Sequence, residues 1–383
     1  MEQRPEDWWQ ATVNVIRALL KATPEHETLS VAVDGTSSTL LLADDKGRAM
    51  TPGLMYNDRR TTQERRSLRT LASPDSVVHS PSSSLSKLLW LIRHCAPVDT
   101  GLHALHQSEW ISGRLCAHYD LGDENNCLKL GYDPINQRWP GWMEQLNLPS
   151  GLLPAVVTPG TILARISRES SAETSLPPAC QVIAGTTDST AAALASGVSL
   201  PGDAVTSLGS TLVCKILSEQ PLFNREYGIY SHRVLGKWLV GGASNVGGSV
   251  LRSHFSDEAL ESLSRQIDPR RSLCLNYYPL PDQGERFPFN DPDMQPRLTP
   301  VPRDRSRFLQ GILEGITGVE RTAYRRLREL GAPQPRRIFS SGGGAGNPTW
   351  MAMRQRILRT PVLPAMHAQA AYGAAKIARK AVS

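Results

Sequence analysis

Residues 182–189 read Val-Ile-Ala-Gly-Thr-Thr-Asp-Ser, an apolar run that ends in a turn of small and hydroxyl-bearing residues. Small residues after a strand let backbone N–H groups approach an anion, and a helix that begins there adds a favourable dipole. Four further apolar runs end in the same way: Val31–Val33 before Asp34-Gly35-Thr36-Ser37, Ala204–Leu208 before Gly209-Ser210-Thr211, Trp238–Val240 before Gly241-Gly242, and Ile338-Phe339 before Ser340-Ser341-Gly342-Gly343-Gly344. Five such turns in one chain predict a cleft that holds phosphate groups.

The composition is that of an ordinary globular protein. The chain has 383 residues, 40% hydrophobic and 20% charged, which is enough for two or three domains. Its net charge of +6 comes from basic residues interspersed with acids, so nucleic-acid binding is not predicted. The polar N-terminus and the lack of a long apolar stretch predict a cytoplasmic protein without a membrane contact. The six cysteines lack metal-ligand spacing and predict a reducing compartment and no protein metal site.

Strands that alternate with helices predict an α/β protein. Helices are expected at 8–22, 83–95, 109–118, 190–197, 307–330 and 369–381, and strands at 31–33 and 40–43, the second running into a hairpin turn at 44–47. In the helix at 83–95, the predicted buried stripe is Leu85, Leu88, Leu89 and Ile92. Residues 149–180 are rich in Pro and Ser and are expected to form a surface connection. Residues 256–304 show no periodicity and are expected to be irregular.

Asp188 is the predicted catalytic acid, because it follows an apolar strand and stands where a helix begins. A carboxylate beside a phosphate cradle can accept the proton of a hydroxyl while backbone amides and Mg²⁺ hold the transferred phosphoryl group. The alternative is that Asp188 only caps the helix. The P-loop and protein-kinase motifs are absent, and neither Ser37 nor Ser210 has the G-x-S-x-G context of a hydrolase nucleophile.

Nearly the whole chain resembles, in order, the FGGY carbohydrate kinases of the sugar-kinase, actin and heat-shock ATPase superfamily. Two stretches are similar to the family's W-x-D-x-R segment at the sugar site and its G-G-x-D motif: Tyr56-Asn57-Asp58-Arg59-Arg60 and Gly185-Thr186-Thr187-Asp188. Five more stretches resemble later segments of the family pattern. Gly209-Ser210-Thr211 is similar to the second phosphate loop, Gly342–Asn347 to the adenosine loop and Tyr372–Ala375 to the closing G-A-A helix. The other two, Gly242–Gly248 and Tyr278–Pro288, resemble two further segments of the pattern. Each motif is only moderately specific, but seven in the right order are strong evidence.

The resemblance implies an ATP-dependent sugar kinase that uses Mg²⁺ and acts on small molecules. Within the family, Asp34-Gly35-Thr36-Ser37, Leu128–Tyr132 and Ala243-Ser244-Asn245 resemble a D-ribulose kinase branch often labelled xylulose-kinase-like. By that resemblance the sugar-binding residues are Asp34, Ser37, Asp58 and Asp188, with Asp188 as general base. The residues implied to hold ATP are Gly209, Ser210, Thr211, Gly342, Gly343, Gly344 and Asn347.

The chain departs from the family pattern at its start. The family's first phosphate loop reads D-x-G-T-S, and its Asp helps to place Mg²⁺. Asp34-Gly35-Thr36-Ser37 lacks the residue between Asp and Gly and follows a predicted helix. We therefore expect the chain to begin about one helix too late, without three leading strands and that aspartate, which would weaken catalysis if each lost donor costs ~10²-fold. Gly346, where relatives often carry Lys or Arg, is a smaller departure.

The expected fold is two actin-like (ribonuclease-H-like) α/β domains around a cleft. Residues 1–195 are predicted to be the sugar-binding domain and residues 196–383 the nucleotide-binding domain, with the last helix free to pack back on the first. Two alternatives remain open. One is a non-catalytic remnant that binds ketose or nucleotide without turnover, and the other is an actin-like or chaperone-type ATPase without a sugar substrate.

Overall fold

Strand β9 (Gln181–Thr187) lies between β2 (Ser30–Gly35) and β8 (Ile162–Arg165) in a three-stranded sheet. The pair β2 and β9 is parallel, with Val31 opposite Val182 and Gly35 opposite Thr187. The two backbones approach closely at Gly185, where a Cβ would lie 1.8 Å from the carbonyl oxygen of Val33. Only glycine fits at this position, and the apolar run Val182–Ala184 lies in the central strand of the sheet.

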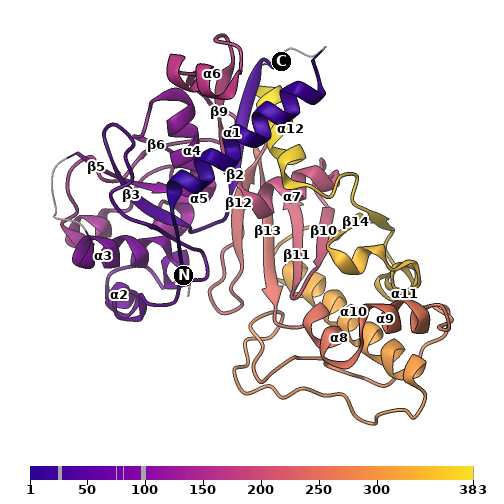
Figure 1. Ribbon diagram of the computed structural model, residues 1–383. Coiled ribbons are helices and arrows are strands. Elements are labelled where there is room, and N and C mark those ends of the chain that lie inside the picture. The colour runs from indigo at the N-terminus through magenta and orange to yellow at the C-terminus, as the bar shows by residue number, and fades with distance from the viewer. Residues whose placement is uncertain (25–27, 75, 81, 96–100, 383) are drawn as a thin grey trace. The chain divides into compact units, whose positions relative to one another are not determined.

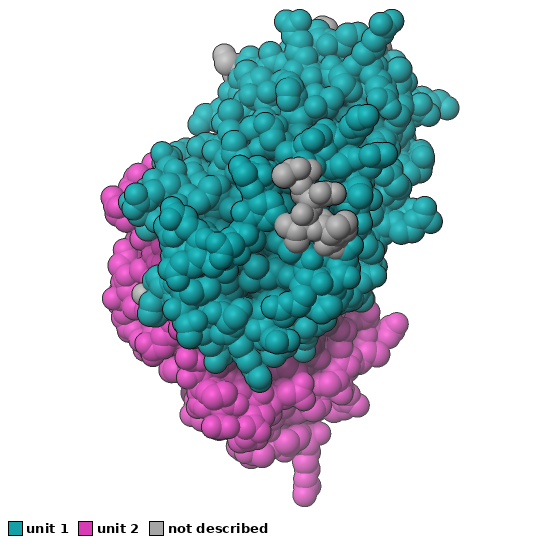
Figure 2. All heavy atoms as spheres, turned by 90° about the vertical axis from the view of Figure 1, so that its left-hand side faces the viewer, with its two compact units in different colours: residues 1–194, 233–236, 369–383 teal, residues 195–232, 237–368 magenta. Residues whose placement is uncertain are grey.

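The computed structural model describes residues 1–24, 28–74, 76–80, 82–95 and 101–382. The chain divides into two units, coloured separately in Figure 2. The first comprises Met1–Leu194, Arg233–Gly236 and Gln369–Ser383, and the second comprises Ala195–His232 and Lys237–Ala368. In the described part, no helix is both long and apolar enough to cross a membrane.

Among the described residues, the first unit holds three sheets and most of the helices (Figure 1). A four-stranded sheet has the order β1-β4-β3-β5, and β6 pairs with β7. The strands not yet given are β1 (Glu2–Gln3), β3 (Leu40–Asp44), β4 (Gly53–Leu54), β5 (Leu102–His106), β6 (Leu121–Asp123) and β7 (Ala155–Val157). The helices are α1 (Pro5–Ala22), α2 (Thr62–Ser67), α3 (Ser84–His94), α4 (Gln107–Cys116), α5 (Glu124–Cys127), α6 (Arg168–Thr174), α7 (Asp188–Ser196, whose last turn crosses the division) and α12 (Ala370–Val382).

The second unit is built on a six-stranded sheet of order β12-β13-β11-β10-β14-β15. Its strands are β10 (Asp203–Leu208), β11 (Leu212–Ser218), β12 (Tyr230–Val234), β13 (Lys237–Ser244), β14 (Arg337–Ser341) and β15 (Val362–Pro364). Its helices are α8 (Gly248–His254), α9 (Asp257–Ser264), α10 (Arg305–Glu329) and α11 (Pro348–Leu358). Short 3-10 helices complete the chain: η1 (Leu68–Thr70), η2 (Val77–His79), η3 (Leu128–Leu130), η4 (Gly141–Leu146) and η5 (Gly343–Gly346).

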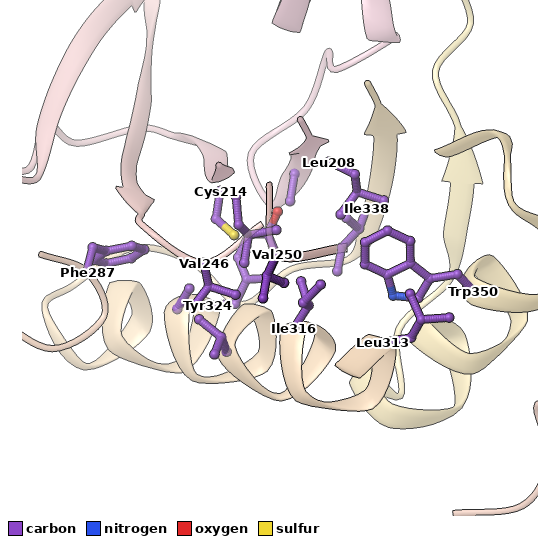
Figure 3. Close-up of a cluster of buried hydrophobic side chains, with 14 of the residues drawn as sticks. Leu208, Cys214, Val246, Val250, Phe287, Leu313, Ile316, Tyr324, Ile338 and Trp350 are labelled. Carbon is purple, nitrogen blue, oxygen red and sulfur yellow. The ribbon is translucent and has the colours of Figure 1, made fainter. Parts of the chain in front are cut away.

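Helix α10 forms one side of the second unit's core. Asp304 caps its first turn by accepting hydrogen bonds from the amides of Ser306 and Arg307, and Gly331, with φ +109°, follows its end. Figure 3 shows side chains of α10, such as Leu313 and Ile316, packed beneath apolar residues of the sheet. This burial removes a continuous apolar stripe from water, which stabilises the helix far more than its own propensity does.

The α/β prediction is confirmed, and so are the six predicted helices, whose ends differ from expectation by three residues at most. Three expectations were wrong. In α3 the fully buried leucines are Leu85, Leu88 and Leu91, while Leu89 and Ile92 are only partly buried. Residues 149–180 contain β7, β8 and α6 because short, half-buried strands leave little periodic signal. Residues 256–304 contain α9, a short helix that Ser256 caps by accepting a hydrogen bond from the amide of Ala259.

Replacing Gly373 by alanine should destabilise the first unit. In α12, a Cβ at Gly373 would lie 1.9 Å from the carbonyl oxygen of Ala191 in α7. Forcing backbones apart costs about 1–3 kcal/mol, more than the ~1 kcal/mol that alanine gains in a helix. Urea-induced unfolding should show the loss. Gly318→Ala in α10, where nothing lies within 4 Å, should instead stabilise, and a Gly373→Ala variant as stable as the wild type would contradict the clash.

Candidate active site

Two carboxyl groups lie at the same edge of the β2–β9–β8 sheet. Because β2 and β9 are parallel, with Asp34 opposite Thr186 and Gly35 opposite Thr187 after a shift in register, Asp34 near the end of β2 and Asp188, which follows β9, are neighbours. Burial and the negative charge of Asp188 raise the pKa of Asp34. The Asp188 Oδ1 accepts a hydrogen bond of 2.6 Å from the amide of Ser189 as α7 begins. The structure thus brings together Asp34 and Asp188, two of the four predicted sugar-binding residues.

The turn that carries Ser37 is held by hydrogen bonds on both sides. Gln107 Oε1 accepts from the amide of Thr36 at 3.1 Å and from its hydroxyl at 3.0 Å. The hydroxyl of Thr39 accepts from the amide of Tyr56 at 3.1 Å and lies 2.6 Å from the Thr36 hydroxyl. Ser37, half-buried at the apex, is therefore presented by a fixed backbone beside Asp34.

Asp58 is nearly fully buried, and its carboxylate is occupied by protein groups. It accepts hydrogen bonds from the N-terminal amine, from the amide of Arg60 at 3.1 Å and from Arg60 Nε at 3.0 Å. Burial alone raises the pKa of Asp58, but these partners outweigh burial and lower it. The ion pair with Arg60 orders the Tyr56–Arg60 segment. A direct role of Asp58 in sugar binding stays a prediction.

Two polar residues of this region were missed by the sequence analysis, Gln107 and Asn125. Asn125 Nδ2 donates to Thr186 Oγ1 and to the carbonyl of Arg233, both at 2.8 Å, and its Oδ1 accepts from the amide of Arg233 at 2.7 Å. Gln107 stands where β5 ends and α4 begins, the same position in the chain that Asp188 has between β9 and α7. Asn125 lies in the four-residue helix α5, which is too short to show a pattern.

Two of the predicted phosphate and adenosine loops line one cavity of the second unit, of about 720 Å³. Gly209 and Ser210 reach it after β10, and Gly343, Gly344 and Asn347 reach it after β14. The predicted residues Thr211 and Gly342 are not among its lining residues. Gly342 has φ +81°, and a Cβ there would lie 2.8 Å from the carbonyl of Leu208, so it lets the two loops meet.

The walls of this cavity are tied together by Asn347. Its Oδ1 caps α11 by accepting from the amide of Trp350 at 3.0 Å, and its Nδ2 donates to Ser264 Oγ of α9 at 2.8 Å. The side chain thus joins two helices that line the cavity. Its predicted contact with adenosine stays a prediction.

Arg252 of α8 adds a positive charge to the cavity that the sequence did not indicate. Its Nη2 donates a hydrogen bond of 2.8 Å to Ser210 Oγ, in the loop predicted to cradle phosphates. The loop backbone is held from the same side, because Gly248 N donates to the carbonyl of Gly209 at 2.7 Å. A guanidinium at this point suits a phosphate group.

A further buried cluster in the first unit consists of His106, Glu109 and Cys127, whose potential ligand atoms lie within 4.8 Å of one another. His106 Nδ1 lies 2.7 Å from Glu109 Oε2, a hydrogen-bond distance, and Cys127 Sγ lies 3.4 Å from Glu109 Oε1. Burial and the negative charges of Glu109 and Asp123 raise the pKa of Cys127, so its thiol stays protonated. Glu109 Oε2 also accepts a hydrogen bond of 2.7 Å from the amide of His106, so His106 and Glu109 belong to a capping box at the start of α4.

Family models match most of the chain. The model described as "FGGY family of carbohydrate kinases, N-terminal domain" matches residues 1–195, and the model for the C-terminal domain of that family matches residues 204–382. The chain belongs to the FGGY family of carbohydrate kinases, which are phosphotransferases.

Individual relatives are distant but cover almost the whole chain. It is 24% identical to xylulose kinase of Bacillus subtilis, over 98% of this chain and 79% of that protein. It is 22% identical to gluconokinase of the same organism, over 94% of this chain and 76% of that protein.

Solved structures show the fold. Xylulose kinase from Rhodospirillum rubrum has a TM-score of 0.85 at 23% identity, covering 98% of this chain and 80% of that one. Plasmodium falciparum glycerol kinase with ADP has a TM-score of 0.84 at 15% identity, and the match covers 100% of this chain and 81% of that one. The predicted two-domain actin-like fold is confirmed.

Proposed function

We propose that this chain is an ATP-dependent kinase that phosphorylates a pentulose, with D-ribulose as the preferred substrate. The observation that carries the proposal is the placement of Asp188 at the end of β9, beside Asp34 and the turn that bears Ser37. The relatives named xylulose kinases support a pentulose, and the motif resemblance to the D-ribulose branch favours ribulose.

In the proposed reaction, Asp188 accepts the proton of the sugar hydroxyl as its oxygen attacks the γ-phosphorus of ATP. The bond from that phosphorus to the bridging oxygen breaks, and ADP leaves. The polar turn around Ser37 orients the sugar, and the Gly209–Thr211 and Gly343–Asn347 loops hold the nucleotide. Mg²⁺ bound to ATP would offset part of the phosphate charge. The phosphate oxygens of ATP would supply the oxygen ligands that Mg²⁺ prefers, and no protein ligand is assigned to the ion.

The test is a coupled assay for ADP release with D-ribulose, D-xylulose, L-ribulose, D-gluconate and glycerol. We expect D-ribulose to give the highest kcat/KM, and ³¹P NMR should show one sugar phosphate formed per ADP. A higher kcat/KM for another pentulose would overturn the ribulose assignment alone. ADP release that ignores added sugar would identify an ATPase, and binding without ADP release would identify a non-catalytic remnant.

Arg252→Gln should weaken the binding of ATP. Removing a charge-assisted contact beside Ser210 should raise the KM for ATP about 10-fold, because such a bond contributes ~1.4 kcal/mol or more. The KM for the sugar should stay within a factor of about two, since Arg252 lies in the second unit's cavity. Arg307→Gln, the same change at an exposed position of α10, is the control. If both variants raised the KM for ATP equally, Arg252 would act only through the net charge of the protein and not through a contact with the nucleotide.

A further inference from the structure

Lys87 of α3 is fully buried, and the proposed reaction does not use it. Its Nζ donates a hydrogen bond of 2.6 Å to the carbonyl of Ser38 and one of 3.3 Å to the carbonyl of Tyr56. The first carbonyl belongs to the turn after β2, and the second begins the Tyr56–Arg60 segment after β4. One amine therefore connects the two segments that carry the predicted sugar-site residues Ser37 and Asp58.

The surroundings make this an unfavourable place for a cation. Burial, together with the charge of Lys129, lowers the pKa of Lys87 to about 7, although the charge of Asp58 acts in the opposite direction. Both hydrogen-bond acceptors are neutral carbonyls rather than carboxylates. A methionine would fill the same space in α3 without the penalty of burying a charge. The hydrogen bonds to the carbonyls of Ser38 and Tyr56 therefore account for a buried amine at this position.

The segment that Lys87 holds is also conformationally unusual. Ser38 has φ +70°, a left-handed conformation that is uncommon and unfavourable for a non-glycine residue. Within the described residues, the buried Ser38 Oγ makes no hydrogen bond, so the side chain does not stabilise this conformation. The contact from Lys87 to the Ser38 carbonyl and the Thr36–Gln107 contacts therefore fix the turn.

We propose that Lys87 is a positioning residue of the sugar site, which holds the Thr36–Ser38 turn and Tyr56 in the arrangement that binds a ketose. This inference rests on the proposed function for the identity of the ligand, but the ordering of the two segments does not. The ammonium form, present below pH 7, is the stronger donor, and it is lost as the pH rises through 7. Order in the two segments, and with it sugar affinity, should therefore fall between pH 6 and 8.

Hydrogen exchange tests the ordering without any ligand. In Lys87→Met, amides of residues 36–39 and 55–58 should exchange at least ~10-fold faster than in the wild type at pH 6, because a buried donor to both segments is gone. Lys376→Met is the matched control, since Lys376 also donates to a carbonyl of the first unit, that of Leu194, at 3.0 Å. Unchanged exchange in the two segments, or an equal increase throughout the first unit, would overturn the proposal.

Calorimetric titration with D-ribulose then tests the consequence for binding. Lys87→Met should weaken sugar binding at least ~10-fold and leave ATP affinity within twofold, whereas Lys87→Gln, which keeps N–H donors but not the charge, should be intermediate. Wild-type affinity should fall from pH 6 to 8, and that of Lys87→Met should not change. If the wild type binds no sugar, the proposed function fails while hydrogen exchange still decides the role of Lys87. Sugar affinity unaffected by Lys87→Met would refute the role in the site.

Discussion

Asp188→Asn is expected to lower kcat for sugar phosphorylation by about 10³-fold while sugar and ATP affinity change little. Asparagine has nearly the same shape as aspartate but cannot accept the proton of the attacking hydroxyl, and a positioned general base contributes roughly 10²–10⁴-fold. The carboxylate follows a buried strand and its Oδ1 is oriented by the amide of Ser189, so the substitution should not disturb the fold. Steady-state kinetics and calorimetric binding measure the two effects separately.

The control is Asp7→Asn in α1, which removes one exposed carboxylate from the same unit. It should leave both kcat and binding unchanged. Turnover by Asp188→Asn at the wild-type rate would remove Asp188 from the mechanism. Loss of sugar binding in proportion to the loss of kcat would make it a binding residue instead of a base.

The sequence was informative where function depends on local backbone geometry. Glycines and hydroxyl residues after apolar runs predicted the edge of the β2–β9 sheet and the two loops that line the cavity of the second unit. In each case one short segment carries both the strand and the turn. Once the structure shows that β2 and β9 are parallel neighbours, the proximity of Asp34 and Asp188 follows from their positions at the ends of these strands.

What the sequence did not predict depends on contacts between distant segments. Lys87 and the carbonyl of Ser38 are separated by 49 positions, and Arg252 and Ser210 by 42. Hydrophobic periodicity says only that a position faces inward, and a lysine at an inward position looks like a break in the pattern. Asn347 illustrates a different limit, because a residue of the predicted loop uses its side chain to join α9 to α11. That the chain lacks the three leading strands of the family pattern stays a prediction.

A buried ion pair holds together the elements from which the second unit's loops emerge. Arg354 of α11 donates to Glu320 of α10 through two bonds of 2.6 and 2.8 Å, and both side chains are fully buried. The same guanidinium donates to Ser340 Oγ of β14 at 2.6 Å, and Glu320 accepts from Thr206 Oγ1 of β10 at 2.6 Å. Although burial lowers the pKa of Arg354, Glu320 raises it by more, so the charge is kept.

Arg354→Met should therefore lower the free energy of unfolding by about 3–5 kcal/mol, because it leaves the carboxylate of Glu320 buried without its partner. Thermal unfolding followed by circular dichroism should show a drop in Tm of roughly 10 °C for a unit of this size. The loss should extend to nucleotide binding, since β10 and β14 lead directly into the Gly209 and Gly343 loops.

The double variant Arg354→Met with Glu320→Leu separates the pair from its surroundings. Replacing both charges by apolar groups of similar volume is often neutral, so most of the lost stability should return. Thr206 then keeps the hydroxyl of Tyr324 as a partner at 2.8 Å, which limits the remaining penalty. A double variant that is no more stable than Arg354→Met would mean that the network is needed for its hydrogen bonds to β10 and β14 rather than for charge compensation.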